Sequence, residues 1–334
     1  MLLRSLKRLA LAAVLGAAAA LPALAQTPVK IGIGFGIGFL PMFIADELKL
    51  VEKHGKDAGL DLKAQFQRFS GSSAMQDAIL SGAVDMGVYG VPALLIVWDK
   101  AHGTPQQVVG VAGVNASPLV LVTNKPNAKS LADLEPADRI AMPALVSPQM
   151  YVLQMLSHKA FGAGQEDKLK NQVVALPHPE SINAILSGGS EVKAYFSTPP
   201  FTQIALDSGK AHKLASSEEA FGGRSSFLVL GATRRYLDAN PKVAAVMVKA
   251  LQEASDLIRN DPRRAAEIYM KVEPSKFVDA DKVAAMLKAA PDDFGVAVHG
   301  VKAYADFMAR RGGLKNVPAS FKDVFPAISG TPSN

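Results

Sequence analysis

The sequence predicts an α/β protein made of two similar lobes that face each other across a cleft. The residues Ala-Ile-Leu-Ser-Gly occur at 78–82 and again at 184–188. In each copy a short amphipathic helix ends at the glycine, where a left-handed backbone is expected, and a strand, an aromatic residue and a proline follow. Strands and helices alternate at lengths typical of a largely parallel sheet with helices on both faces. Because a solenoid needs at least about three repeats, two copies indicate two lobes.

The first lobe begins with a strand at Val29, where apolar residues alternate with Lys30 and four glycines. This stretch does not match the dinucleotide fingerprint G-x-G-x-x-G, because Ile37 and Phe39 stand where glycine is required. The other elements expected in this lobe are strands over 60–66, 83–88, 107–114 and 119–123, helices over 41–53 and 92–100, and a helix opened by 70–72.

The second lobe begins after 125–127 and repeats the alternation of strand and helix. Its expected elements are strands over 139–142, 172–175 and 192–196, and helices over 148–159, 179–186 and 199–208. The apolar run 227–230 returns the chain to the first lobe, where helices follow at Asn240-Pro241, at Asp261-Pro262 and over 281–289 and 301–310.

These elements define the predicted domain limits. We expect the first lobe to contain residues 26–120 plus 228–334 and the second lobe to contain 121–227. Two strand-like crossovers, near 119–123 and 227–231, join them. Paired crossovers form a hinge about which two lobes close.

The N-terminus has the pattern of a secretory signal peptide. Arg4, Lys7 and Arg8 precede an apolar run over 9–21 that is too short to span a bilayer, and Ala23-Leu24-Ala25 is a small-x-small cleavage site. The sequence therefore predicts a signal peptide over 1–25, cleaved after Ala25. It contains no cysteine for a disulfide or a lipid anchor. We expect a freely soluble protein in the periplasm.

The charge of the chain does not indicate nucleic-acid binding. The 36 Lys and Arg residues exceed the 30 Asp and Glu residues by six, and loss of three basic residues with the signal peptide leaves a formal charge of +3. These charges are interspersed, whereas a nucleic-acid interface gathers basic residues on one face or element. A small anionic ligand is compatible with this balance.

Candidate ligand-binding residues lie in the loops that follow the parallel strands, where ligands of open α/β sheets bind. Hydroxyl-bearing helix starts attract anions because their backbone N–H groups are unpaired, although the same residues also serve as ordinary N-caps. Arg224 is added for its bidentate oxyanion geometry. Aromatic residues enclose the ligand or, alternatively, pack in the core. The candidates are Gly38, Phe39, Ser70, Gly71, Ser72, Tyr89, Asn115, Ser147, Gln149, Ser197, Thr198 and Arg224.

No catalytic or metal-binding motif stands out. The chain has neither a G-x-S-x-G elbow nor an H-E-x-x-H motif, and its six histidines show no metal spacing. Ser190 and Lys193 match S-x-x-K in letters, but this stretch is predicted to enter a strand and not to form the helical turn that the motif needs. We predict no catalytic residue, no metal and no cofactor.

Residues 39–45, 70–72 and 78–88 resemble the periplasmic substrate-binding proteins of ABC importers, in the nitrate/sulfonate/taurine group. The resemblance extends over essentially the whole mature chain. It implies a type II periplasmic-binding-protein fold, with two lobes on a two-strand hinge, and delivery of a sulfonate, carboxylate or similar small organic anion to a membrane permease with a cytoplasmic ATPase. The mature protein is then a monomer that is not embedded in the membrane.

Three segments depart from the family pattern. Lys193 stands where Asp is common, residues 197–200 replace an aromatic or acidic residue before the proline, and residues 49–51 replace a Gly-x-Phe helix end. The resemblance therefore predicts the fold of this chain better than it predicts the identity of its ligand.

Two other functions remain open from the sequence. One is an enzyme on the same fold. A thiamine pyrimidine synthase of this kind uses a cysteine-rich loop, whereas this chain has no cysteine. The related dehydratases are cytoplasmic, whereas this chain has a predicted export signal. The other is a ligand-sensing partner of a different membrane system, for which the sequence offers no discriminator.

Overall fold

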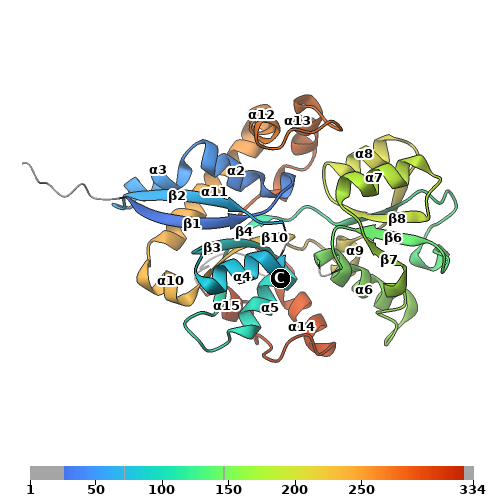
Figure 1. Cartoon of the computed structure of the whole chain (residues 1–334), viewed down its shortest axis with the longest axis horizontal. Coiled ribbons are helices and arrows are strands. Elements are labelled where there is room, and N and C mark those ends of the chain that lie inside the picture. Colours follow the sequence, from blue (N-terminus) through green and yellow to red (C-terminus); the bar gives the residue numbers. More distant parts are fainter. Residues whose placement is uncertain (1–25, 71, 146, 327–334) are drawn as a thin grey trace, which may run out of the picture.

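The computed structural model describes residues 26–70, 72–145 and 147–326, so the predicted signal peptide lies outside the described residues. Figure 1 shows two α/β lobes side by side, each built on a five-stranded sheet. We call the lobe with the sheet order β2-β1-β3-β10-β4 lobe 1, and the lobe with the order β7-β6-β8-β5-β9 lobe 2. The predicted fold class, two lobes joined by a two-strand hinge, is confirmed.

Lobe 1 is formed by the first and last parts of the chain. Its N-terminal elements are β1 (Thr27–Ile33), η1 (Ile37–Phe39), α2 (Leu40–Glu47), α3 (Leu50–Asp57), β2 (Leu62–Arg68), α4 (Ser72–Ser81), β3 (Met86–Gly90), α5 (Val91–Lys100) and β4 (Val108–Asn115). Its C-terminal elements are β10 (Leu228–Thr233), α10 (Arg234–Ala239), α11 (Val243–Asn260), α12 (Pro262–Val272), α13 (Ala280–Ala289), η4 (Pro291–Asp293), α14 (Val301–Arg310) and α15 (Phe321–Val324).

Lobe 2 is formed by the middle of the chain. Its elements are β5 (Val120–Thr123), η2 (Leu131–Asp133), β6 (Arg139–Met142), α6 (Pro148–Phe161), η3 (Lys170–Gln172), β7 (Val173–Ala175), α7 (His178–Ser187), β8 (Val192–Ser197), α8 (Phe201–Asp207), β9 (His212–Ser216) and α9 (Ser217–Phe221).

The sequence repeat occupies the same place in both lobes. Helices α4 and α7 end at Gly82 and Gly188, whose φ angles of 78° and 72° are left-handed as predicted. The strands that follow, β3 and β8, are each the third strand in their sheet order. Both orders also correspond position by position, with one strand from a crossover in the fourth place. The repeat therefore marks two copies of one topology.

The sheets are mixed, which corrects the expectation of a largely parallel arrangement. Strand β10 runs antiparallel to β3 and β4, and β5 runs antiparallel to β8 and β9. Each of these two strands has just crossed over from the other lobe. It enters its new sheet from the side at which the parallel strands have their carboxyl ends. It therefore runs in the opposite direction to its neighbours.

Helices cover both faces of each sheet, as the sequence predicts. In lobe 1, α2, α3, α11 and α12 pack on one face, and α4, α5 and α14 lie on the other (Figure 1). In lobe 2, α7 and α8 lie on one face and α6 and α9 on the other. Within the part of the chain that the structure describes, no helix has both the length and the apolar character that crossing a membrane requires.

Several local elements differ from the predictions. The helix expected over 41–53 is two helices, because Lys49 adopts a positive φ of 52° between α2 and α3. Strand β9 and helices α9, α10 and α15 were not predicted. β9, with the sequence His-Lys-Leu-Ala-Ser, has no apolar run or clear alternation, and it forms through pairing with β5 at the sheet edge. The three helices have six residues or fewer, which is too short for a helical period to appear.

Candidate ligand-binding site

The two crossovers between the lobes lie side by side and are hydrogen-bonded to each other. The backbone N–H of Phe227 donates to the carbonyl of Asn115 at 2.9 Å, and the backbone N–H of Ser217 donates to the carbonyl of Leu119 at 2.8 Å. The backbone N–H of Leu119 in turn donates to the hydroxyl of Ser217 at 3.1 Å. The first bond joins the two crossovers, and the other two tie the first crossover to the start of α9, the helix that precedes the second crossover.

A strip of chain near the C-terminus, residues 293–299, runs along β4 and reaches this hinge. The backbone N–H of Gly113 in β4 donates to the carbonyl of Val296 at 2.9 Å. The side-chain amide of Asn115 donates to the carbonyl of Asp293 at 3.2 Å, across a separation of 178 residues. The strip therefore brings the side chain of Asp293 to the hinge from a distant part of the sequence.

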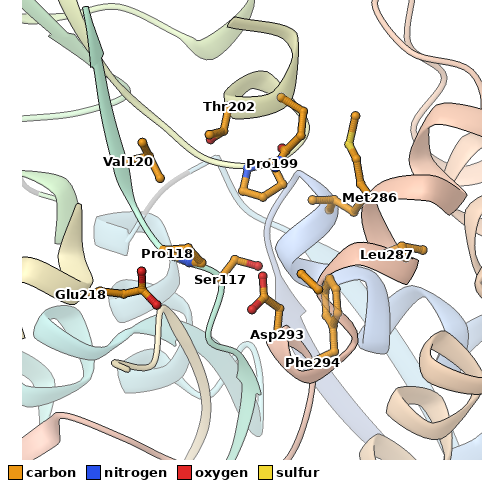
Figure 2. Close-up of a pocket in the computed structure, with 13 residues that line it drawn as sticks. Ser117, Pro118, Val120, Pro199, Thr202, Glu218, Met286, Leu287, Asp293 and Phe294 are labelled. Atoms are coloured by element: carbon orange, nitrogen blue, oxygen red, sulfur yellow. The ribbon is translucent and has the colours of Figure 1, made fainter. Parts of the chain in front are cut away.

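A cavity of about 200 Å³ lies beside the hinge, between the lobes (Figure 2). Residues of both lobes and of the first crossover line it. Its apolar wall contains Ile37 of η1, Met286 and Leu287 of α13, Phe294 of the strip, and Pro118, Val120 and Pro199. Because both lobes contribute, a movement of one lobe against the other changes the shape of this space.

The polar part of the wall is acidic. Glu218 at the start of α9 and Asp293 in the strip both line the cavity, and Figure 2 shows the side chain of Ser117 between them. Two hydroxyl or amide side chains of α8, Thr202 and Gln203, complete the polar lining. The lining residues include no Lys, Arg or His. The space thus offers hydrogen-bond acceptors and negative charge beside an apolar wall.

Asp293 is largely buried and has several partners. Its carboxylate lies 3.2 Å from Nη2 of Arg224, with 16% of the Asp293 side chain exposed. Burial raises the pKa of Asp293 above its usual value, whereas the hydrogen bond with Ser117 and the charge of Arg224 lower it in part. The ion pair and the Ser117 hydroxyl therefore stabilise a carboxylate at the edge of the cavity.

Comparison with known proteins relates this architecture to one family. The model of the NMT1-like family matches residues 23–272. The chain belongs to the NMT1-like family. A comparison with curated protein sequences finds no match.

Solved structures that are similar to this NMT1-like protein include binding proteins of the predicted kind. The alkanesulfonate-binding protein SsuA from Xanthomonas axonopodis pv. citri, bound to MOPS, has a TM-score of 0.66 at 20% identity, over 88% of this chain and 96% of that chain. The periplasmic aliphatic sulphonate binding protein SsuA from Escherichia coli has a TM-score of 0.70 at 18% identity, over 90% and 98%. The periplasmic nitrate-binding protein NrtA from Synechocystis PCC 6803 has a TM-score of 0.63 at 14% identity, over 90% and 84%. These likenesses show that the NMT1-like chain shares their fold.

Five of the residues predicted from the sequence lie next to the cavity of this NMT1-like protein without lining it. Asn115 and Arg224 both contact Asp293. The hydroxyl of Ser197 donates to the carbonyl of Val120 at 2.9 Å and shares a hydrogen bond with Thr202. The other two, Gly38 and Thr198, are sequence neighbours of lining residues. Ser197 is fully buried, so its hydroxyl is used within the fold.

The other predicted residues lie elsewhere. Ser147 caps α6 by accepting from the N–H of Met150, as in ordinary N-capping. The Tyr89 hydroxyl points back toward Gly87 and Met75 inside lobe 1, and it has no hydrogen-bond partner among the described residues. The ring of Phe39 covers Gly34. Ser70 is exposed, Gln149 is buried, and Ser72 begins α4. Gly71 lies outside the described residues.

The loops that were expected to line a cleft are partly in contact. A Cβ atom on Gly90, at the end of β3, would lie 2.5 Å from Cγ of Pro148, the first residue of α6. Lobe 1 therefore touches lobe 2 at this point, and the contact leaves no space for a side chain. The twelve predicted residues remain predictions for a conformation in which these loops separate.

None of the residues that line the cavity is among the twelve predicted from the sequence. Ser117, Glu218 and Asp293 belong to no motif, and α13 has the pattern of an ordinary amphipathic surface helix. They come together only because the C-terminal strip returns to the hinge. Within the described ranges, no group of three or more His, Asp or Glu side chains is placed to hold a metal ion.

Proposed function

We propose that this protein is a solute receptor that binds a small organic molecule between its two lobes and delivers it to an ABC importer. The observation that carries the proposal is the cavity at the hinge, which residues from both lobes enclose. A space of this kind binds its ligand most tightly when the lobes are closed, so that ligand binding favours the closed state. The names of the similar structures, which are binding proteins for alkanesulfonate and nitrate, support the same role.

The proposed receptor function also implies where the protein acts and how its chain divides into two lobes. We infer export through the signal peptide over 1–25, with cleavage after Ala25, and action as a monomer in the periplasm. The proposed lobe limits are 26–120 plus 228–334 for lobe 1 and 121–227 for lobe 2. The proposed partners are a membrane permease and its ATPase. We further propose that the protein is not an enzyme, because the similar structures are named as binding proteins.

A thermal unfolding screen tests the receptor function. Mature protein is heated with a panel of sulfonates, carboxylates, nitrate, amino acids and amines, each in large excess. A ligand present at about one hundred times its Kd is expected to raise the Tm by roughly 5 °C. Each ligand found is then incubated with the protein and analysed by mass spectrometry. An unchanged ligand supports a receptor, whereas turnover supports an enzyme.

Two results oppose the proposal. If no compound of the panel changes the Tm, and native mass spectrometry of the protein from its own host detects no bound small molecule, the cavity is not a solute site. If a ligand binds but the radius of gyration from small-angle scattering stays the same with and without it, the lobes do not close on the ligand.

A further inference from the structure

We propose that the ligand of the hinge cavity carries a protonated nitrogen, as an amine or amidine on a small apolar body. This inference rests on the proposed receptor function and names its substrate class. It differs from the small anion expected from the sequence, because the residues that line the cavity were not among those from which the anion was inferred.

The charge of the lining favours a cation. Glu218 and Asp293 come from different elements and face the same space, with Ser117 between them (Figure 2). An anion placed there meets two carboxylates, of which Asp293 is largely buried, and like charges repel each other. A cationic nitrogen in the same position offsets the repulsion between the carboxylates.

Arg224 does not reverse this balance. Its guanidinium pairs with the Asp293 carboxylate at 3.2 Å and also donates to the backbone carbonyl of Asp292. It is not one of the residues that line the cavity. The pair therefore holds Asp293 in place, while Glu218 forms no salt bridge within the described residues and adds a second negative charge at the cavity wall.

The side-chain amide of Gln203, in α8, lies on the lobe 2 side of the cavity and adds a neutral polar group to its lining. The N–H groups of an amine or amidine donate hydrogen bonds, and the carboxylates of Glu218 and Asp293 accept them.

The rest of the wall requires an apolar body. Met286 and Leu287 of α13 lie on one side of the cavity, Val120 on the other and Phe294 on the lower side (Figure 2), and Pro199 also lines it. Burial of a small aliphatic or aromatic group there removes apolar surface from water. The apolar wall and the acceptors together describe a small cation with a hydrophobic end.

Size-matched probes test the inference. Mature protein is titrated calorimetrically, and heated, with the cations benzylamine, benzamidine and butylamine and with the anions benzoate, benzenesulfonate and butanesulfonate. At least one cation is expected to bind and to raise the Tm by roughly 3 °C or more at saturating concentration, whereas the anions of the same size leave the Tm unchanged. Binding of the anions without binding of any cation overturns the inference and leaves the receptor function standing. If none of the six compounds binds, the inference is overturned. The receptor function is then tested separately by the larger compound panel of the thermal unfolding screen.

A matched pair of variants locates the bound cation. Glu218→Gln removes one cavity charge from an exposed side chain, so the fold is expected to be kept. It should weaken cation binding about tenfold or more, because a hydrogen bond to a charged group is lost. Glu219→Gln is the control: it changes the next residue of α9, which pairs with Lys213 and does not line the cavity, and should change the Kd less than about twofold. Equal effects of the two variants would place the cation outside the cavity.

Discussion

Asp293 links three parts of the molecule through one residue. Its backbone carbonyl accepts hydrogen bonds from the N–H of Ala116 and from the side chain of Asn115, at 2.7 and 3.2 Å. Its carboxylate pairs with Arg224, which precedes β10. Both crossovers of the hinge are therefore tied to the C-terminal strip at the point where that strip borders the cavity.

His178 predicts a dependence of stability on pH. Its ring stacks on Phe201 at 5.3 Å and hydrogen-bonds the buried hydroxyl of Tyr195. Burial lowers the pKa of His178 from 6.5 to about 4. Between these values the unfolded chain binds a proton that the folded protein does not, so the free energy of unfolding falls as the pH decreases. From pH 8 to pH 5 this one residue should remove about 2 kcal/mol.

The His178→Gln variant provides the measurement. Urea unfolding of wild type and variant is followed at pH 8, 6 and 5 through the fluorescence of Trp98, the single and buried tryptophan. The variant should lose about 2 kcal/mol less than the wild type between pH 8 and pH 5. Parallel curves for the two proteins would show that His178 does not titrate differently on folding.

For single residues, the sequence correctly predicted that hydroxyl residues occur at helix starts, but it did not predict which groups their side chains bind. Hydroxyl residues do open helices, but Ser147 serves the N–H of its own helix and Ser197 serves the neighbouring strand. A short polar side chain satisfies local backbone groups before it is available to a ligand. The sequence did not indicate the role of Asp293, because its contact with Asn115 spans a separation of 178 positions in the chain.

The C-terminal strip depends on the lack of a side chain in β4. A Cβ atom on Gly113 would lie 2.1 Å from the carbonyl oxygen of Ala297 and 2.9 Å from that of Gly295. Both atoms are backbone, so they cannot move aside by rotation of a side chain. The close approach of strip and strand thus requires glycine at this position.

Gly113→Ala should therefore detach the strip. The variant is expected to lose about 2 to 3 kcal/mol of unfolding free energy through overpacking, and to bind ligand more weakly because the strip carries part of the cavity wall. Chemical denaturation and calorimetric titration measure the two effects. Gly189→Ala is the control, since its Cβ would meet no atom within 4 Å, and should stay within about 0.5 kcal/mol of the wild type. A tolerated Gly113→Ala would contradict the close packing.

Elements with strong periodicity were predicted well. β6 matches its expected limits, and the helices that begin with an N-cap and a proline, such as α6 and α12, were found close to their starts. The break between α2 and α3 was not predicted, because Lys49 in a left-handed conformation has no sequence signature. The antiparallel pairing of β5 and β10 depends on the direction in which each strand enters the sheet of the other lobe. The hydrophobic pattern of a single strand does not reveal this direction.

Across the whole molecule, a charged contact holds the lobes together on the side away from α13. Arg311, just after α14 of lobe 1, lies 3.3 Å from Glu166 and 2.6 Å from Asp167, which follow α6 of lobe 2. These side chains are 29%, 15% and 45% exposed. The pairs are therefore partly screened by solvent and contribute modestly to closure.

Arg311→Ala should shift the molecule toward an open form. The expected loss is about 1 kcal/mol in the closing equilibrium at low salt, and less at about 0.5 M NaCl because salt screens the pairs. Small-angle scattering of the ligand-free protein should show a larger radius of gyration for the variant. Lys302→Ala, which removes a pair with Asp306 within α14, should leave the scattering curve unchanged. An equal radius for all three proteins would show that the contact does not hold the lobes.

The position of the cavity wall in the chain also has a consequence for biosynthesis. Met286, Leu287, Ala290, Asp293 and Phe294 all lie far along the chain from the other lining residues, so a nascent chain lacks one side of the cavity until residues 286–294 have been made. Solute present before that point of synthesis has no finished cavity to occupy and cannot stabilise the partly made chain. Only a chain that includes residues 286–294 can enclose this cavity from both sides.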